Sequence, residues 1–182
     1  CKWHLAGAQR VYGYRPQLTV WGKSIANGFS VAALSGSREI MNLGALDSPE
    51  RSVHLLSTTH GSETHSLAAM VATVSEMRDK NIIPLNLIRA KQLRCALEGE
   101  ISSLGLEDDV KIVGHEALMR VNTPRGLEYK TLLLQELLHN GVLFKGLLYT
   151  TWSHQQEEIE YTVDAFRKAL LVLRSAMEFG IN

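Results

Sequence analysis

Apolar residues recur at steps of three and four positions in four parts of the chain: residues 62–80, 82–104 and 128–141, and the segment after Ser153. This spacing predicts four helices, because it places the apolar side chains on one face of each. The expected buried stripes are Leu67, Met70, Val71, Val74 and Met77 in the first helix, Leu93, Leu97, Ile101 and Leu104 in the second, and Ile159, Val163, Phe166, Leu170, Leu173 and Met177 in the last.

Residues that favour helix ends support three of these helices. Pro84 suits the first turn of the second helix, and Gly105 is expected to end it. The pair Asn140-Gly141 is expected to end the third helix. Ser153, with Gln156 three residues later, predicts a capping box at the start of the last helix.

Shorter apolar runs separate these helices and predict strands. The run 29–36 is expected to be a short buried strand, and the segment 38–44 a helical turn closed by Gly44. The other expected strands are residues 50–58, a strand pair or bent strand over 110–121, and residues 142–149. Helices and strands therefore alternate, which is typical of an α/β protein.

The composition changes near Lys80. Glycine, alanine and hydroxyl residues are concentrated before it, and a regular alternation of helices and strands follows. We therefore expect two domains, comprising residues 1–80 and 81–182.

Composition narrows the class of protein. The chain has 182 residues, 45% of them hydrophobic, and a formal net charge of zero, so a sizeable core is expected and nucleic acid is an unfavourable partner. No apolar run approaches the roughly 20 residues of a membrane span. Cys1 and Cys95 have no metal-binding spacing and fit a reducing cytoplasm. Because the chain starts at Cys1 without Met, we expect it to be a piece of a longer protein.

Lys23 lies in an otherwise uncharged run, Leu18–Leu34, among small residues such as Gly22, Ala26 and Gly28. Burial among apolar neighbours lowers the proton affinity of a lysine and makes it a nucleophile for carbonyl groups. A lysine of this kind can form a Schiff base with pyridoxal 5'-phosphate (PLP). The alternative is a lysine whose ammonium extends from a strand end into water.

A second candidate is the hydroxyl-rich loop that contains Ser57, Thr58 and Thr59 before Gly61. Hydroxyls and free amides at a helix N-terminus suit a phosphate group. Ser and Thr also gather at helix starts as simple caps, so the loop has two interpretations.

Three histidines in the same region, His54, His60 and His65, are candidate metal ligands by residue type. His60 and His65 are five residues apart, so a helix would not bring both to one face as a zinc-binding H-E-x-x-H motif does. No metal site is predicted.

Taken together, two motifs resemble one family. The segment "PQLTVWGKSIANGFSVAALSGSREIM", followed about thirty-five residues after Lys23 by "STTHGSETHSLAA", is similar to the class III PLP-dependent aminotransferases, which include glutamate-1-semialdehyde aminomutase. The resemblance extends over nearly the whole chain, through "KTLLLQELLHNGVLF" and "SHQQEEIEYTVDAFRKAL". It implies a fold-type I transferase: residues 1–80 finish the large PLP-binding domain, and residues 81–182 form a small α+β C-terminal domain.

The resemblance also implies roles for single residues. Lys23 would bind PLP as a Schiff base and later move protons at the substrate carbon. Thr58 would contact the cofactor phosphate of the other subunit of a homodimer, with Thr59 in this role if the alignment shifts by one residue. The substrates would be a small-molecule amino donor and a carbonyl acceptor.

Three functions stay open at this point. The first is transfer of an amino group between two molecules, the second is the intramolecular transfer of an aminomutase, and the third is a PLP-fold protein that only dimerises. In the family, the pyridine-nitrogen aspartate, a phosphate loop and the stacking aromatic precede the region that this chain resembles. We therefore expect the chain alone to be inactive.

Overall fold

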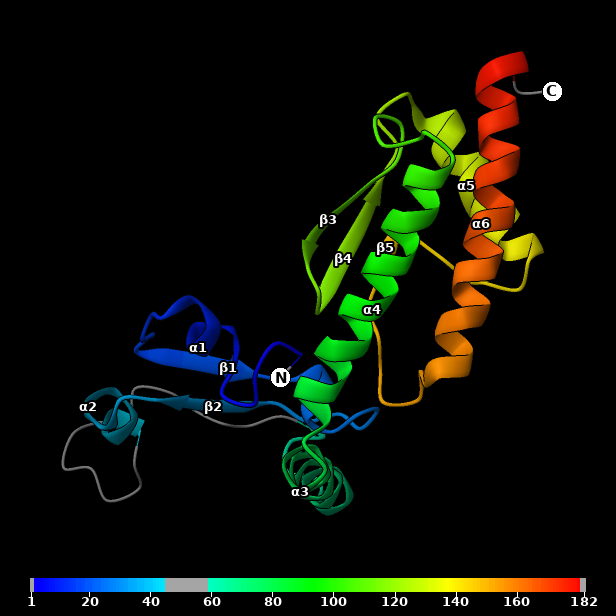
Figure 1. The fold of residues 1–182 in the computed structure, drawn as a ribbon. Helices are drawn as coiled ribbons and strands as arrows, with labels where there is room; N and C mark the ends of the chain where they lie inside the picture. The colour runs from blue at the N-terminus through cyan, green and yellow to red at the C-terminus, as the bar shows by residue number, and fades with distance from the viewer. Residues whose placement is uncertain (1, 45–58, 181–182) are drawn as a thin grey trace. The chain divides into compact units, whose positions relative to one another are not determined.

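The computed structural model describes residues 2–44 and 59–180, and the chain divides into two compact units (Figure 1). Unit 1 comprises residues 1–83 and unit 2 residues 84–182. The division falls inside the first turn of a long helix, three residues after Lys80, near which the composition changes.

Unit 1 contains short elements and one long helix. Its described elements are α1 (Ala8–Tyr12), β1 (Leu18–Trp21), the 3-10 turn η1 (Lys23–Ile25), β2 (Ala33–Gly36), α2 (Arg38–Met41), the 3-10 turn η2 (Asn42–Gly44) and α3 (Thr64–Asp79). The helical turn predicted for residues 38–44 is present as α2 and η2. The strand predicted for residues 50–58 lies outside the described residues.

The strands of unit 1 form an antiparallel pair in which Thr19 lies opposite Ser35 and Trp21 opposite Ala33. Within the described residues this sheet has only two strands, so each strand has one edge without a partner. The prediction of a buried strand here is wrong, because three of the four β2 residues are exposed. A β-hairpin with no second layer of described residues over it leaves its apolar side chains in solvent, and Val20 is 77% exposed.

Helix α3 forms where the helical spacing predicts it, but its buried face is rotated from the predicted stripe. Ser66 is buried, whereas Leu67 and Val71 are exposed, the latter by 63%. Met70, Val74 and Met77 are half-buried. The helix therefore packs through Ser66 and these three half-buried side chains, and two bulky apolar groups remain on the surface of this unit.

Unit 2 is built from three helices and a three-stranded antiparallel sheet of order β3-β4-β5. Its elements are α4 (Ile82–Ser103, whose first two residues belong to unit 1), β3 (Lys111–His115), β4 (Leu118–Asn122), α5 (Leu127–His139), β5 (Leu147–Leu148) and α6 (Gln156–Phe179). The strand pair predicted for residues 110–121 is confirmed as β3 and β4. Of the predicted strand 142–149, only Leu147 and Leu148 form a strand, β5, which pairs with β4.

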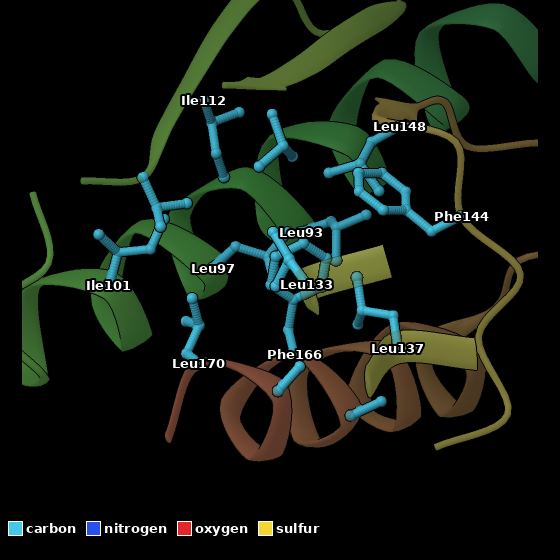
Figure 2. Packing of buried hydrophobic residues seen from close by; sticks show 14 of the residues in the cluster. Leu93, Leu97, Ile101, Ile112, Leu133, Leu137, Phe144, Leu148, Phe166 and Leu170 are labelled. Atoms are coloured by element: carbon cyan, nitrogen blue, oxygen red, sulfur yellow. The ribbon is translucent and has the colours of Figure 1, made fainter. Parts of the chain in front are cut away.

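One hydrophobic core joins every layer of unit 2, and Figure 2 shows its side chains converging between the helices and the sheet. In β4 the buried residues alternate with exposed ones, so one face of the sheet points into the core. The predicted stripes of α4 and α6 are confirmed, with Leu104, Val163 and Met177 at the margin. The core includes Leu93, Leu97 and Ile101 of α4, Ile112, Met119 and Val121 of the sheet, Leu133 and Leu137 of α5, and Ile159, Phe166, Leu170 and Leu173 of α6.

The N-cap of the last helix lies two residues later in the chain than predicted. Gln155 is the N-cap residue, and its backbone N–H donates to the Glu158 carboxylate at 2.8 Å in a capping box. The capping box predicted for Ser153 and Gln156 is therefore wrong. His154 explains the shift, because its Nδ1 accepts the N–H of Thr151 at 2.9 Å and keeps this segment in a turn.

Two arginines of α4 connect this helix to the rest of unit 2. Arg94 donates to the carbonyl of Ile112 at 3.2 Å and to that of Gly114, both in β3. Arg89 lies 5.0 Å from the ring centroid of Trp152 and donates to the Gln155 side chain at 2.6 Å. These bonds fix the helix against the sheet edge and against the turn that precedes α6.

We predict that Phe166→Ala lowers the free energy of unfolding of unit 2 by about 3–5 kcal/mol, because it leaves a cavity in a fully buried site. Phe179→Ala in the same helix is the matched control, since that ring is 80% exposed and should contribute less than about 0.5 kcal/mol. Urea unfolding followed by circular dichroism measures both changes. Equal effects of the two substitutions would contradict this description of the core.

Candidate functional site

Lys23 occupies an unusual backbone conformation directly after a strand. Strand β1 ends at Trp21, Gly22 is extended with φ −169°, and Lys23 has φ +53°, in the left-handed region. Few residues other than glycine adopt this region, and Asn, Asp and His are the ones enriched there. The local sequence therefore does not favour this conformation, and the surrounding structure must hold it.

The turn that Lys23 opens is anchored by the two residues that follow it. Ile25 and Ala26 are only 4% and 1% exposed, and η1 packs against α3. The Ala26 N–H donates to the Lys23 carbonyl at 3.3 Å, and the Ile25 N–H to that of Gly22 at 3.4 Å. A left-handed residue costs about 1–2 kcal/mol, which this burial offsets. Such conformations occur preferentially at functional sites, where they fix the direction of a side chain.

The side chain of Lys23 is exposed in the described structure, and it makes no hydrogen bond or ion pair with any described residue. The expectation of a lysine enclosed by apolar neighbours is wrong for the described residues of this single chain. The neighbouring residues explain the difference: Gly22 and Gly28 carry no side chain that could cover the amine, and Phe29 is itself exposed. The strand-end position that both interpretations require is confirmed.

The segment after Lys23 touches the start of α3. The rings of Phe29 and His65 meet edge to face, with their centroids 5.9 Å apart. His65 is the second residue of α3, directly downstream of the hydroxyl-rich loop. The structure thus brings together the lysine motif and the hydroxyl-rich motif, although these two rings are thirty-six positions apart in the sequence.

The hydroxyl-rich loop is described only in part. Thr58 lies outside the described residues, whereas Thr59 is exposed in the turn that precedes α3. The N-cap residue of α3 is Glu63, and no side chain caps the helix. The interpretation of the described hydroxyls as helix caps is therefore wrong, and among the described residues no side chain accepts a hydrogen bond from the first-turn amides of α3.

The histidines of this region interact with a carboxylate. Nδ1 of His60 lies 3.0 Å from the Glu63 carboxylate, and Nε2 of His65 lies 3.4 Å from its other oxygen. Among the described residues, no three His, Cys, Asp or Glu side chains are arranged to hold a metal ion. His54 lies outside the described residues.

One contact at this site was missed by the sequence analysis. The Trp21 indole N–H donates to Ser35 Oγ at 2.7 Å, between the two strands of the hairpin whose connecting segment contains Lys23. A tryptophan near a strand end usually needs such an acceptor, and this preference is the only signal in the sequence. The bond fixes the last residue of β1, two positions before Lys23.

Two relatives indicate which enzymes the chain is similar to. A glutamate-1-semialdehyde 2,1-aminomutase of Chlorobaculum tepidum is 29% identical over 181 residues, which cover 92% of this chain and 41% of the relative. A 3-aminobutyryl-CoA aminotransferase of Cloacimonas acidaminovorans is 25% identical over 182 residues, which cover 95% of this chain and 42% of that enzyme. No protein-family model matches the chain.

Solved structures give the fold. A transaminase with PLP bound superimposes with a TM-score of 0.81 at 22% identity, covering 96% of this chain and 42% of that one. An omega-transaminase from Sphaerobacter thermophilus gives 0.80 at 21% identity, with 95% and 42% covered. This chain has the fold of the PLP-dependent transaminases. The predicted fold-type I architecture and the resemblance to aminotransferases and aminomutases are both confirmed.

The transaminase fold is present only in part. The chain spans about two-fifths of the length of the relatives it matches, 41% of the aminomutase and 42% of the aminotransferase. Among the described residues, no helix is long and apolar enough to cross a membrane.

We predict that Lys23→Gly is more stable than Lys23→Ala by about 1 kcal/mol, because glycine adopts the left-handed conformation without strain. The control is the same pair of substitutions at Lys91, which is exposed in the interior of α4. There the order should reverse, since glycine in a helix is about 1 kcal/mol less favourable than alanine. Thermal unfolding of the four variants measures both differences. Alanine as the more stable residue at both positions would show that the turn at Lys23 is not left-handed in solution.

Proposed function

We propose that this chain is part of a PLP-dependent enzyme that transfers an amino group from a small-molecule donor to a carbonyl acceptor, with Lys23 as the residue that binds the cofactor. One observation carries the proposal: Lys23 is held in a left-handed conformation at a strand end, with an amine that has no partner among the described residues. The similarity to an aminotransferase and to aminomutases, and the fold of PLP-dependent transaminases, support it.

The residues around Lys23 fit a planar cofactor. Gly22 and Gly28 present no side chains, so a flat ring can approach the backbone. A lysine amine is the group that reacts with an aldehyde to form a Schiff base. When bound, PLP supplies an electron sink for bond cleavage at the amino-bearing carbon of a substrate.

Each candidate residue then has a distinct task. Lys23 would hold the cofactor aldehyde through its amine and afterwards carry a proton to and from the substrate carbon. Thr58, or Thr59 in the alternative alignment, would donate its hydroxyl to the phosphate. The uncapped amides at the start of α3 lie just after this loop and favour a negative charge.

The two units suit different parts of such an enzyme. Unit 1 carries Lys23 and the described part of the hydroxyl-rich loop, so we assign it to the cofactor-binding domain and unit 2 to the small C-terminal domain. We further propose a homodimer in which Thr58 reaches the cofactor of the other subunit. The free thiol of Cys95 fits a reducing cytoplasm.

Intramolecular transfer is the second candidate, because several of the most similar relatives are glutamate-1-semialdehyde aminomutases. The two reactions differ in whether a second molecule must accept the amino group. Incubation of the whole enzyme with glutamate-1-semialdehyde alone, and separately with glutamate and a set of keto acids, distinguishes them. Product from the semialdehyde alone supports the aminomutase, and product only from paired substrates supports the aminotransferase.

We predict that borohydride reduction of the PLP-loaded protein attaches the cofactor to the peptide that contains Lys23, and that Lys23→Ala abolishes this adduct. Lys80→Ala, at an exposed residue that pairs with Glu76, is the control and should leave the adduct unchanged. Peptide mass spectrometry identifies the modified lysine. A trapped adduct on any other lysine of the wild-type protein would refute the assignment.

We predict that Thr58→Ala weakens PLP binding by about 1–3 kcal/mol, the contribution of a hydrogen bond to a charged group. If the site is shared between subunits, mixing Lys23→Ala with Thr58→Ala protein should recover activity. Each heterodimer then has one intact site and one doubly damaged site.

The control for this mixing experiment combines Thr58→Ala protein with a Lys23→Ala, Thr58→Ala double variant. Those heterodimers have no intact site, so no recovery is expected. Heterodimers of the first mixture that form without regaining activity would contradict the shared site.

A further inference from the structure

An open pocket of about 570 Å³ (the cavity) lies on the surface of unit 1, and Lys23 does not line it. Its volume is in the usual range for sites that bind small molecules. Its wall is formed by helix α1, the loop after it, and the hairpin residues Thr19, Ser35 and Gly36. The lining residues are Ala6, Gln9, Arg10, Gly13, Tyr14, Arg15, Pro16, Thr19, Ser35 and Gly36.

The charged residues of this wall are all basic. None of the ten lining residues is acidic, whereas Arg10 and Arg15 are both basic and exposed. Neither guanidinium makes an ion pair or hydrogen bond with a described residue. The whole chain is neutral, yet residues 2–44 contain five Lys and Arg residues and a single acidic residue, Glu39. The cavity thus lies in the basic part of a chain with no net charge.

Hydroxyl groups add neutral hydrogen-bond donors to the two arginines. Thr19 and Ser35 lie opposite each other in the hairpin, and both line the cavity. Ser35 Oγ accepts the indole N–H of Trp21 at 2.7 Å, so its own hydroxyl hydrogen is available to another acceptor. Tyr14 contributes a third hydroxyl.

We propose that this cavity binds a small organic anion that carries carboxylate or phosphate groups. Arginine has five N–H donors and no acceptor, in a planar arrangement that matches an oxyanion in pairs of hydrogen bonds. Two such groups beside three hydroxyls, with no carboxylate among the described lining residues, form a set of donors that suits an acceptor-rich anion. The site takes no part in the proposed amino transfer, and its test does not depend on PLP.

The first test uses the unaltered protein and needs no variant. Phenylglyoxal modifies exposed arginines, and peptide mass spectrometry reads the extent at each position. Saturating citrate, at an ionic strength kept constant with sodium chloride, should slow the modification of Arg10 and Arg15 by roughly tenfold, because their guanidinium groups then face an anion. Arg38, exposed in the same unit but outside the cavity, should react at an unchanged rate.

The second test measures affinity by calorimetry, with citrate and inorganic phosphate as probes. Arg10→Gln combined with Arg15→Gln should weaken binding of citrate by about tenfold or more, whereas Arg38→Gln should leave it unchanged within roughly twofold. Arg10→Lys combined with Arg15→Lys keeps the charge but loses the paired geometry, and an intermediate affinity is expected.

Two outcomes would overturn the proposal. Equal slowing of all three arginines by citrate would show that the anion has no preferred site. Protection of Arg10 and Arg15 without added anion, at every protein concentration, would show that a carboxylate of the protein itself already occupies the cavity.

Discussion

The structure of unit 2 depends on the burial of one stripe of α6. Phe166, Leu170 and Leu173 have no exposed surface, and they meet side chains from α4, α5 and the sheet in a single core. Because interiors are packed closely, the positions of the other helices follow from this stripe. The arginines of α4 add directional bonds to the sheet edge and to the turn before α6, and these bonds refine an arrangement that the apolar contacts establish.

At Lys23 in unit 1, the local backbone preference and the packing of the surrounding residues oppose each other. There the local conformation is unfavourable by itself, and the burial of Ile25 and Ala26 against α3 compensates for it. Structures that satisfy local preferences almost everywhere depart from them chiefly where function requires it. A flexible lysine on a favourable turn would sample many directions, whereas a fixed backbone limits where the amine can reach. This constraint makes Lys23 a candidate reactive residue, although its amine is exposed in the described chain.

The predictions from sequence succeeded where periodicity alone decides the outcome. The stripes of α4 and α6 and the β3–β4 pair follow from spacing, because a core on one side imposes it. The buried face of α3 and the burial of β2 were wrong, since both depend on which surfaces face each other in space. At the site, the sequence correctly predicted that Lys23 lies at a strand end. No sequence pattern predicts a left-handed φ at a lysine. The Trp21–Ser35 bond and the arginine-lined cavity join distant positions that only the fold brings together.

The two-stranded sheet of unit 1 has a consequence for how the polypeptide behaves in solution. Both outer edges of the β1–β2 pair present backbone N–H and C=O groups without partners among the described residues, beside exposed apolar side chains such as Val20. Natural proteins usually protect such edges with charges, prolines or a covering element, because an open edge templates the addition of a strand from another molecule. A hairpin of two strands is also only marginally stable in water. These two edges are therefore the places in the described part of unit 1 where a further strand can add through backbone hydrogen bonds.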